Sequence, residues 1–179
     1  IDRLTHTTVG AGMILDRATD DAKSARKTVE VEAAGSIVPA EERAQRLAQK
    51  PATVWLTGFT GSGKAAIAFA LERRLFDEGK VAHVLAGHNA RLGISSDLDF
   101  SADDRAENLR RAAEVSRLFN QAGRISICSF LSPSAEDRQT ARDIVTGGDH
   151  GSPFLEVYCN APDDVAAQRS PDHDAIRPY

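Results

Sequence analysis

The chain has 179 residues, of which 41% are hydrophobic and 27% charged, a composition typical of a globular protein with a sizeable core. Its 22 basic and 26 acidic side chains give a net charge of −4, which offers no argument for binding nucleic acid or an anionic membrane surface. No apolar run approaches the roughly 20 residues that span a bilayer, so we expect no membrane segment.

The two cysteines, Cys128 and Cys159, both lie in apolar runs that are typical of buried strands. In a reducing compartment, buried free thiols are commoner than a disulfide, so we expect a cytoplasmic protein. The chain begins at Ile1 rather than Met and carries no signal peptide, from which we expect a fragment cut from a longer polypeptide.

The first 50 residues differ in pattern from the rest of the chain. Residues 1–15 alternate apolar and polar side chains, as a strand or hairpin does, and residues 16–36 have the charged, Ala-rich composition of a solvated linker. Pro39 then opens a predicted helix over 40–50. We therefore predict the C-terminal remnant of a preceding domain in 1–19, a linker and lead-in helix in 20–50, and a separate domain in 51–179.

Within this last domain, strand and helix patterns alternate. Strands are predicted at 54–56, 81–85, 125–130 and 154–159, and helices at 65–78, 103–121, 135–145 and 162–169. Such alternation favours an α/β fold, a parallel sheet with helices on both faces. Ligands of such sheets bind beyond the carboxyl ends of the strands, which here are 57–63, 86–91, 130–133 and 160–161.

The stretch after the first strand has the spacing Gly58-x-x-x-x-Gly63-Lys64 of a phosphate-binding loop. Its glycines let backbone N–H groups turn toward an anion at the start of a helix, and Lys64 adds a positive charge. The alternative, a tight turn that binds nothing, seldom combines this spacing with a lysine between a strand and a helix. We therefore predict a P-loop NTPase-type fold, although Ala65 stands where a hydroxyl normally holds Mg²⁺.

Two further segments carry candidate ligand-binding residues. Arg91 follows the second strand, and Arg105, Asn108 and Arg111 share one side of the long predicted helix, so Arg91 and Arg105 can grip a second anion. By composition alone, a solvated charged helix face is favoured over such a site. Ser132 precedes a proline at the end of the third strand, where a hydroxyl is often only a turn former.

These motifs together resemble the adenylylsulfate (APS) kinases over about two thirds of the chain, from Thr53 to about Arg169. The family's Gly-Leu-Ser-Gly-Ser-Gly-Lys-Ser-Thr matches 58–66, and its Asp-Gly-Asp-Asn-x-Arg matches 86–91. Its Gly-Phe-Ser-x-x-Asp-Arg-x-Glu-Asn-x-Arg-Arg run matches 99–111, and Phe-Ile-Ser-Pro matches 130–133. Residues 1–14 also resemble the end of the GTPase-type large subunit of bacterial sulfate adenylyltransferase, which some bacteria fuse to an APS kinase.

The resemblance implies transfer of the γ-phosphate of ATP to the 3′-hydroxyl of APS, giving PAPS and ADP with Mg²⁺. It also implies APS contacts from Arg91, Arg105 and Asn108, and catalytic roles for Lys64 and for Ser132, which matches a serine that is phosphorylatable in some members. As partners it implies a second copy in a homodimer and a fused or associated sulfate adenylyltransferase subunit. The residues implied to bind ATP are Gly58, Phe59, Thr60, Gly61, Ser62, Gly63, Lys64 and Ala65.

The sequence departs from the family where the chemistry takes place. Ala65 replaces the hydroxyl that ligates Mg²⁺, and Ala86 and His88 replace both acids of Asp-Gly-Asp-Asn, so we predict no metal ligands. The basic lid of the family has no match after Arg169. Two functions therefore stay open: an APS kinase, or a catalytically degenerate kinase-like domain that binds nucleotide or PAPS in a regulatory or structural role. An unrelated P-loop kinase with another small acceptor is the third alternative.

Overall fold

The computed structural model describes residues 35–147 and 151–169, and the described residues from Ile37 onward belong to one compact unit. The strand or hairpin expected in 1–15, and with it the remnant expected in 1–19, lies outside the described residues. In the ranges that are described, no helix combines the length and apolar character needed to cross a bilayer.

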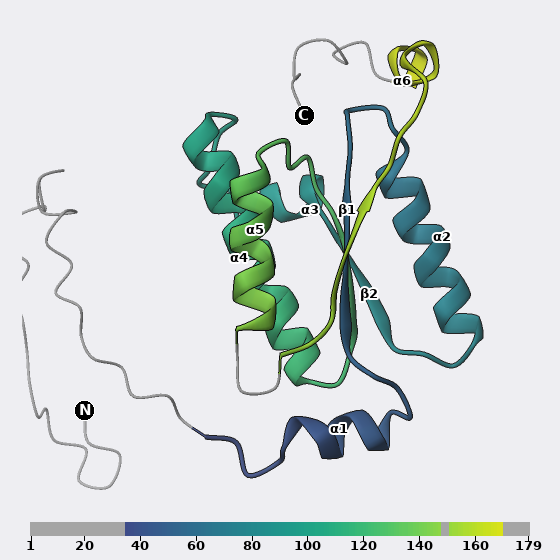
Figure 1. The fold of residues 1–179 in the computed structure, drawn as a ribbon, viewed down its shortest axis with the longest axis vertical. Coiled ribbons are helices and arrows are strands. Elements are labelled where there is room, and N and C mark those ends of the chain that lie inside the picture. The colour runs from purple at the N-terminus through teal and green to yellow at the C-terminus, as the bar shows by residue number, and fades with distance from the viewer. Residues whose placement is uncertain (1–34, 148–150, 170–179) are drawn as a thin grey trace, which may run out of the picture. The chain divides into compact units, whose positions relative to one another are not determined.

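Four parallel strands form one sheet in the order β2-β3-β1-β4, with helices between them along the chain (Figure 1). The elements are α1 (Ala40–Arg46), β1 (Ala52–Thr57), α2 (Lys64–Asp77), β2 (Ala82–Ala86), α3 (Gly87–Arg91), α4 (Ala102–Gln121), β3 (Ile125–Ser129), α5 (Ala135–Thr146), β4 (Phe154–Tyr158) and α6 (Asp163–Arg169). The predicted alternation of strands and helices is confirmed. The short α3 was not predicted, because a single turn is too short to show hydrophobic periodicity.

Each face of the sheet has its own hydrophobic core, because successive side chains of a strand point to opposite faces. Trp55 and Leu56 of β1 are both buried, and they lie in different cores. Trp55 stacks on Phe130 and on Phe154, with ring centroids 5.7 Å apart in each pair. Helices α4 and α5 cover this face, and α2 packs on the other (Figure 1). The predicted α/β fold with helices on both faces is confirmed.

Two helices begin at the carboxyl edge of the sheet with capping side chains. The Ser101 hydroxyl accepts a hydrogen bond from the Asp104 N–H (3.1 Å), and the Ser134 hydroxyl accepts one from the Asp137 N–H (3.2 Å). Each cap satisfies an N–H group that the helix itself leaves without a partner. The caps therefore fix where α4 and α5 leave this edge of the sheet.

The described elements cover the edge strand β4 on one face only. Leu155 and Val157 lie beside Val54 and Leu56 of β1, on the face where α2 packs against β1, β2 and β3. They are nevertheless 55% and 42% exposed. Within the described residues, β4 thus presents an apolar face to solvent.

Helices α1, α2 and α4 all end with the same hydrogen-bond pattern. The residue after the cap has a positive φ, and it donates to the carbonyl three residues back, while the next N–H reaches five residues back. That residue is Gly79 after α2 and Gly123 after α4, but Ala48 after α1, with φ 47°. A left-handed conformation strains any residue with a Cβ. This motif ends α1 at Arg46, four residues earlier than predicted.

We expect Ala48→Gly to raise the free energy of unfolding by about 0.5–1 kcal/mol, because glycine adopts the left-handed conformation without strain. The measurement is urea unfolding followed by circular dichroism. Gly79→Ala is the matched control, since a Cβ at Gly79 would meet nothing within 4 Å. It should lower the stability by a similar amount. A destabilised Ala48→Gly variant would contradict the assignment of strain.

Candidate functional site

The predicted phosphate loop lies between β1 and α2, at the carboxyl edge of the sheet. Gly58, Gly61 and Gly63 have φ values of 143°, 82° and 88°. A Cβ at Gly58 would lie 2.5 Å from the Cys159 carbonyl oxygen, and one at Gly61 would lie 2.3 Å from that of Ala166. At Gly58 and Gly61, both the positive φ and the close approach of another backbone segment therefore require glycine. The loop has the form of an anion cradle.

Lys64 turns its amine back into this loop. Its Nζ donates to the carbonyl oxygens of Gly58 (2.7 Å) and Phe59 (2.6 Å), and it lies 3.4 Å from the Ser62 hydroxyl. Burial lowers the pKa of Lys64 from 10.5 to about 8, while its interaction with the Cys159 thiol acts in the opposite direction. A phosphate in the loop must compete with these carbonyls for the ammonium.

Helix α6 closes one side of the phosphate loop. Ala166 is fully buried against Gly61, and a Cβ at Gly63 would lie 3.3 Å from Nη1 of Arg169. Phe59 packs edge-on against Tyr158, with ring centroids 6.2 Å apart. The structure thus brings the eight predicted ATP-binding residues, 58–65, together on one loop supported by β4 and α6.

The predicted substrate residues Arg91 and Arg105 both donate hydrogen bonds to the segment that precedes α4. Nη1 of Arg91 donates to the carbonyl oxygens of Leu98 (3.2 Å) and Asp99 (2.5 Å), and Nη1 of Arg105 donates to that of Phe100 (3.1 Å). The guanidinium of Arg91 also lies 4.3 Å from the centre of the Phe100 ring. Since these bonds use Nη1 alone and a guanidinium has five N–H donors, each arginine keeps donors for a ligand.

Phe100 is a site candidate that the sequence reasoning did not single out. Its ring is 72% exposed and lies against Arg91. An exposed aromatic ring supported by a guanidinium offers a flat surface on which a planar base can stack. Its position inside the matched 99–111 motif could have identified it from the sequence.

Asn108, one helical turn after Arg105, is 5% exposed, and its Oδ1 has no hydrogen-bond partner. In the described part of the chain, Ser95 Oγ is the other buried side-chain atom in this condition. A buried polar atom without a partner costs about 1–3 kcal/mol, so such atoms call for an explanation. Oδ1 of Asn108 can accept a hydrogen bond from a ligand.

Arg111 does not take part in an anion site. It donates to both carboxylate oxygens of Asp97 (2.5 and 2.8 Å), to Glu107 (2.9 Å) and to the Ile94 carbonyl (2.7 Å). Arg110, and then Arg111, hold the pKa of Glu107 down to about 2 against its partial burial. Arg111 instead fastens the loop before α4 to that helix.

Ser132 is fully buried, away from the surface of the site. Its hydroxyl accepts a hydrogen bond from Nε1 of Trp55 (3.2 Å) and donates to Oγ1 of Thr57 (2.9 Å). Thr57 in turn donates to the Ser132 carbonyl (3.2 Å). These partners give Ser132 a structural task, and its catalytic role stays a prediction.

The positions that depart from the APS kinase motifs offer no hard oxygen ligand. Ala65 is exposed at the start of α2, Ala86 ends β2, and His88 is exposed on α3. Among the described residues, no cluster of three or more His, Cys, Asp or Glu side chains is placed to hold a metal ion. The chain's own residues therefore do not fit a protein-bound Mg²⁺ at these positions.

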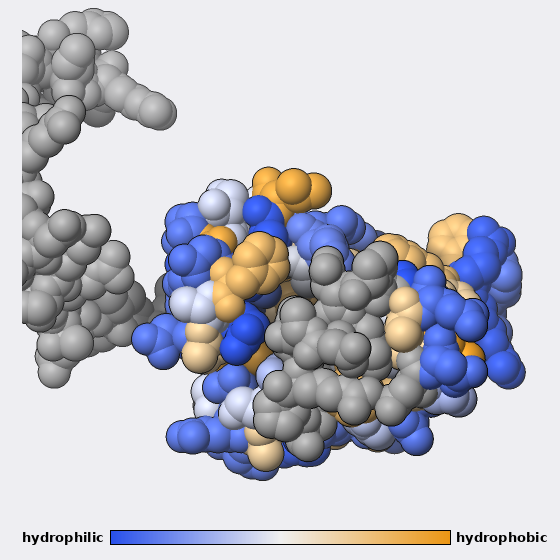
Figure 2. Space-filling model, turned by 90° about the horizontal axis from the view of Figure 1, so that it is seen from above, coloured by the Kyte–Doolittle hydropathy of each residue, from blue (hydrophilic) through white to orange (hydrophobic). Residues whose placement is uncertain are grey.

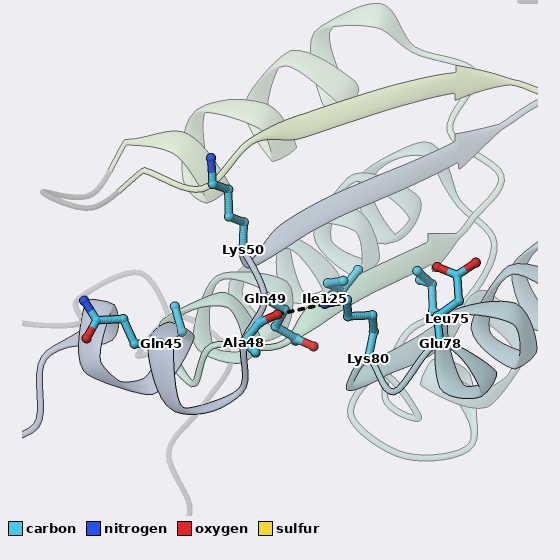
Figure 3. Close-up of a pocket in the computed structure, with 9 residues that line it drawn as sticks. Gln45, Ala48, Gln49, Lys50, Leu75, Glu78, Lys80 and Ile125 are labelled. Atoms are coloured by element: carbon cyan, nitrogen blue, oxygen red, sulfur yellow. Dashed lines mark hydrogen bonds between the residues drawn. The ribbon is translucent and has the colours of Figure 1, made fainter.

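A hollow on the surface lies apart from the site and has different surroundings. Seen from the carboxyl end of the strands, the visible rim is mostly hydrophilic with separate apolar patches (Figure 2). A hollow of about 570 Å³ lies at the opposite end, between α1, the end of α2 and the start of β3 (Figure 3). Lys80, which lines it, donates to the Ala48 carbonyl (2.7 Å). None of the predicted site residues lines this hollow.

The profile of the family described as "Adenylylsulphate kinase" matches residues 50–173. The chain belongs to this family. The adenylylsulphate kinase resemblance expected from the motifs is thus confirmed. Similarity reaches beyond residues 50–173, because the match to a curated bifunctional protein covers 94% of the chain and so includes part of residues 1–49.

That relative is the "Bifunctional enzyme CysN/CysC" of Rhodopirellula baltica, 47% identical over 174 residues. The "Adenylyl-sulfate kinase" of Clostridium acetobutylicum is 44% identical over 131 residues, which are 73% of this chain and 63% of that protein. The chain spans about a quarter (26%) of the R. baltica relative and less than two thirds of the C. acetobutylicum one.

Among solved structures, the chain is similar to the Mycobacterium tuberculosis APS kinase CysC in complex with AMPPNP and APS. The TM-score is 0.64 and the identity 43%, over 68% of this chain and 69% of that one. The hexameric APS kinase from Thiobacillus denitrificans is similar with a TM-score of 0.56 and 27% identity, over 69% of this chain and 26% of that one. The fold therefore matches that of adenylylsulphate kinases.

The lowered pKa of Lys64 predicts a pH dependence of stability. Between about pH 8 and 10.5 the folded chain has released this proton while the unfolded chain still binds it, so the free energy of unfolding rises with pH in this window. The measurement is urea unfolding of the wild type and of Lys64→Met at pH 7 and at pH 10. The difference in their free energies of unfolding should change in favour of the wild type by on the order of 1 kcal/mol. This is less than the whole pKa shift would give, because the amine is only partly buried. A difference that stays constant would show that the amine is not desolvated.

Proposed function

We propose that this chain is an APS kinase domain, which transfers the γ-phosphate of ATP to the 3′-hydroxyl of APS. The observation that carries the proposal is the presence, at one edge of the sheet, of the glycine-built cradle of 58–64 and the arginine-gripped segment before α4. A phosphoryl donor needs the first, and an anionic acceptor with a planar base suits the second. The complex of the M. tuberculosis relative with AMPPNP and APS supports the same pairing of ligands.

On the donor side, the backbone N–H groups of 58–65 bind the phosphates of ATP. Lys64 exchanges the carbonyls of Gly58 and Phe59 for phosphate oxygens, which restores a fully charged ammonium. Phosphoryl transfer relies on positioning and charge neutralisation, and both are properties of this loop.

On the acceptor side, Arg91 and Arg105 bind the phosphosulfate, and the exposed ring of Phe100 supports the adenine. Asn108 accepts a hydrogen bond from the same ligand, which satisfies its otherwise unpartnered oxygen. Ser132 remains a proposed site residue, acting from inside the protein rather than by contact with solvent.

A catalytically degenerate domain that binds nucleotide or PAPS is the second candidate function. Ala65, Ala86 and His88 favour it, because they remove a hydroxyl and two carboxylates from the site. Any metal ion that accompanies ATP must then be held by nucleotide oxygens and water. Both candidates require nucleotide binding, and turnover distinguishes them.

The wider assignments are also proposals. We propose that residues 1–19 end a preceding domain, that 20–50 link it to the kinase domain of 51–179, and that the whole protein includes a sulfate adenylyltransferase subunit, as its bifunctional relatives suggest. A homodimer in the cytoplasm is the proposed working state. The hexameric relative supports only that proteins of this family assemble.

The proposed function is tested by coupled detection of ADP from ATP, APS and Mg²⁺. We expect ADP formation that depends on APS and that falls at least 100-fold in Lys64→Ala, with ADP binding weakened about 10-fold because a phosphate partner is lost. Lys80→Ala, at the opposite end of the sheet, is the control and should match the wild type. ADP binding without APS-dependent turnover would favour the degenerate domain.

Restoring the missing groups tests their importance directly. The triple variant Ala65→Ser, Ala86→Asp and His88→Asp should turn over on the order of 100-fold faster than the wild type, because charge neutralisation at the transferred phosphate contributes several kcal/mol. The matched control moves the hydroxyl by one position, combining Ala66→Ser with the same two acids. An equal gain in both variants, or none in either, would contradict the assignment of Ala65.

A further inference from the structure

We propose that Arg138 is a positioning residue, which fixes the β3–α5 corner (residues 130–134) relative to the phosphate loop. The inference rests on the proposed function, since this corner and the phosphate loop lie at the ends of neighbouring strands. Leu56 of β1 is in register with Ser129 of β3, so 130–134 and 58–64 leave the sheet side by side.

Arg138 holds the corner through its backbone. Nη1 donates to the carbonyl oxygens of Ser132 (2.7 Å) and Pro133 (2.9 Å), and Nε donates to the Glu156 carboxylate on β4 (2.7 Å). The side chain of Arg138 is 18% exposed and that of Glu156 is 29% exposed. One rigid guanidinium thus joins α5, the corner and the edge strand, and a shorter or uncharged side chain cannot make all three bonds.

The corner is in turn bonded to the residue that starts the phosphate loop. Thr57 immediately precedes Gly58, and its Oγ1 exchanges hydrogen bonds with the hydroxyl (2.9 Å) and the carbonyl (3.2 Å) of Ser132. The Ser132 carbonyl therefore accepts from both Arg138 and Thr57. A continuous chain of bonds runs from Glu156 through Arg138 and Ser132 to the base of the loop.

This arrangement matters to a reaction that depends on positioning. In phosphoryl transfer the attacking and leaving oxygens must be in line, and a displacement of about 1 Å can reduce the rate about 100-fold. Loss of Arg138 leaves the Pro133 carbonyl without this donor and the corner held only through the bonds of Ser132 to Trp55 and Thr57, so we expect the corner to move more. Ligand affinity need not change, because the hydrogen bonds of Arg138 go to Ser132, Pro133 and Glu156, outside the cradle and the residues proposed to bind APS.

Arg142 provides a matched control on the same helix. It donates to the same Glu156 carboxylate (3.1 Å) and to a backbone carbonyl, that of Phe154 (3.2 Å). Its guanidinium lies 4.7 Å from the centre of the Phe154 ring. It shares the charge, the ion pair and the carbonyl bond of Arg138, but these hydrogen bonds go to β4 and not to the corner.

The first test is hydrogen exchange of the backbone amides of 130–132 in the full 179-residue chain. We expect Arg138→Gln to speed this exchange at least 10-fold, and Arg142→Gln to leave it within 2-fold of the wild type. Unchanged exchange in Arg138→Gln, or equal acceleration in Arg142→Gln, would overturn the inference. This measurement needs neither APS nor turnover.

The second test is steady-state ADP formation, at a temperature where both variants are fully folded. We expect Arg138→Gln to lower kcat at least 10-fold with the KM values for ATP and APS within 2-fold, and Arg142→Gln to keep kcat within 2-fold. Arg138→Lys, which can keep part of the contacts, should fall between. A loss confined to KM, or shared equally by Arg142→Gln, would refute the positioning role. If the wild type forms no ADP, the proposed function fails, and hydrogen exchange alone decides whether Arg138 fixes the corner.

Discussion

The indole of Trp55 connects the core of this domain to its functional edge. It lies on the inner strand β1, fully buried, with the ring of Phe130, just after β3, and that of Phe154 on β4 stacked beside it. Its one N–H donates to the Ser132 hydroxyl. A buried indole needs a partner for this N–H, so packing on this face also dictates where the chain turns after β3. The packing of the core therefore helps to determine the geometry of the site.

The sheet and the phosphate loop were predictable because their signals are local. Short apolar runs mark the strands, a period of about 3.6 residues marks the longer helices, and the spacing of Gly58, Gly63 and Lys64 marks the loop. The end of α1 was missed because Ala48 takes a conformation that a sequence normally announces with glycine. The burial of Ser132 was not predictable either, because its partner Thr57 lies 75 residues away in the chain.

The cationic side chains of the site show a further limit of reasoning from sequence. The sequence predicts an anion site at Arg91 and Arg105, and it places Arg111 on the same side of the helix as Arg105. In the structure, Arg111 is used up by Asp97 and Glu107, whereas Arg91 and Arg105 bind carbonyl oxygens through one nitrogen each. A carbonyl holds a guanidinium in place without cancelling its charge, and a carboxylate cancels it. The nature of the intramolecular partner, rather than the arginine itself, determines which positive charge can serve a ligand.

The uncovered face of β4 has a consequence for the behaviour of this chain in isolation. An edge strand that exposes Leu155 and Val157 is a template on which another strand can pair, and pairing would also bury those side chains. Only Glu156 carries a charge along this strand, and Arg138 and Arg142 already hold it on the opposite face. Among the residues that the structure describes, this edge therefore lacks the exposed charged side chains that usually block self-association. We therefore expect self-association of the isolated chain through this edge to increase with its concentration.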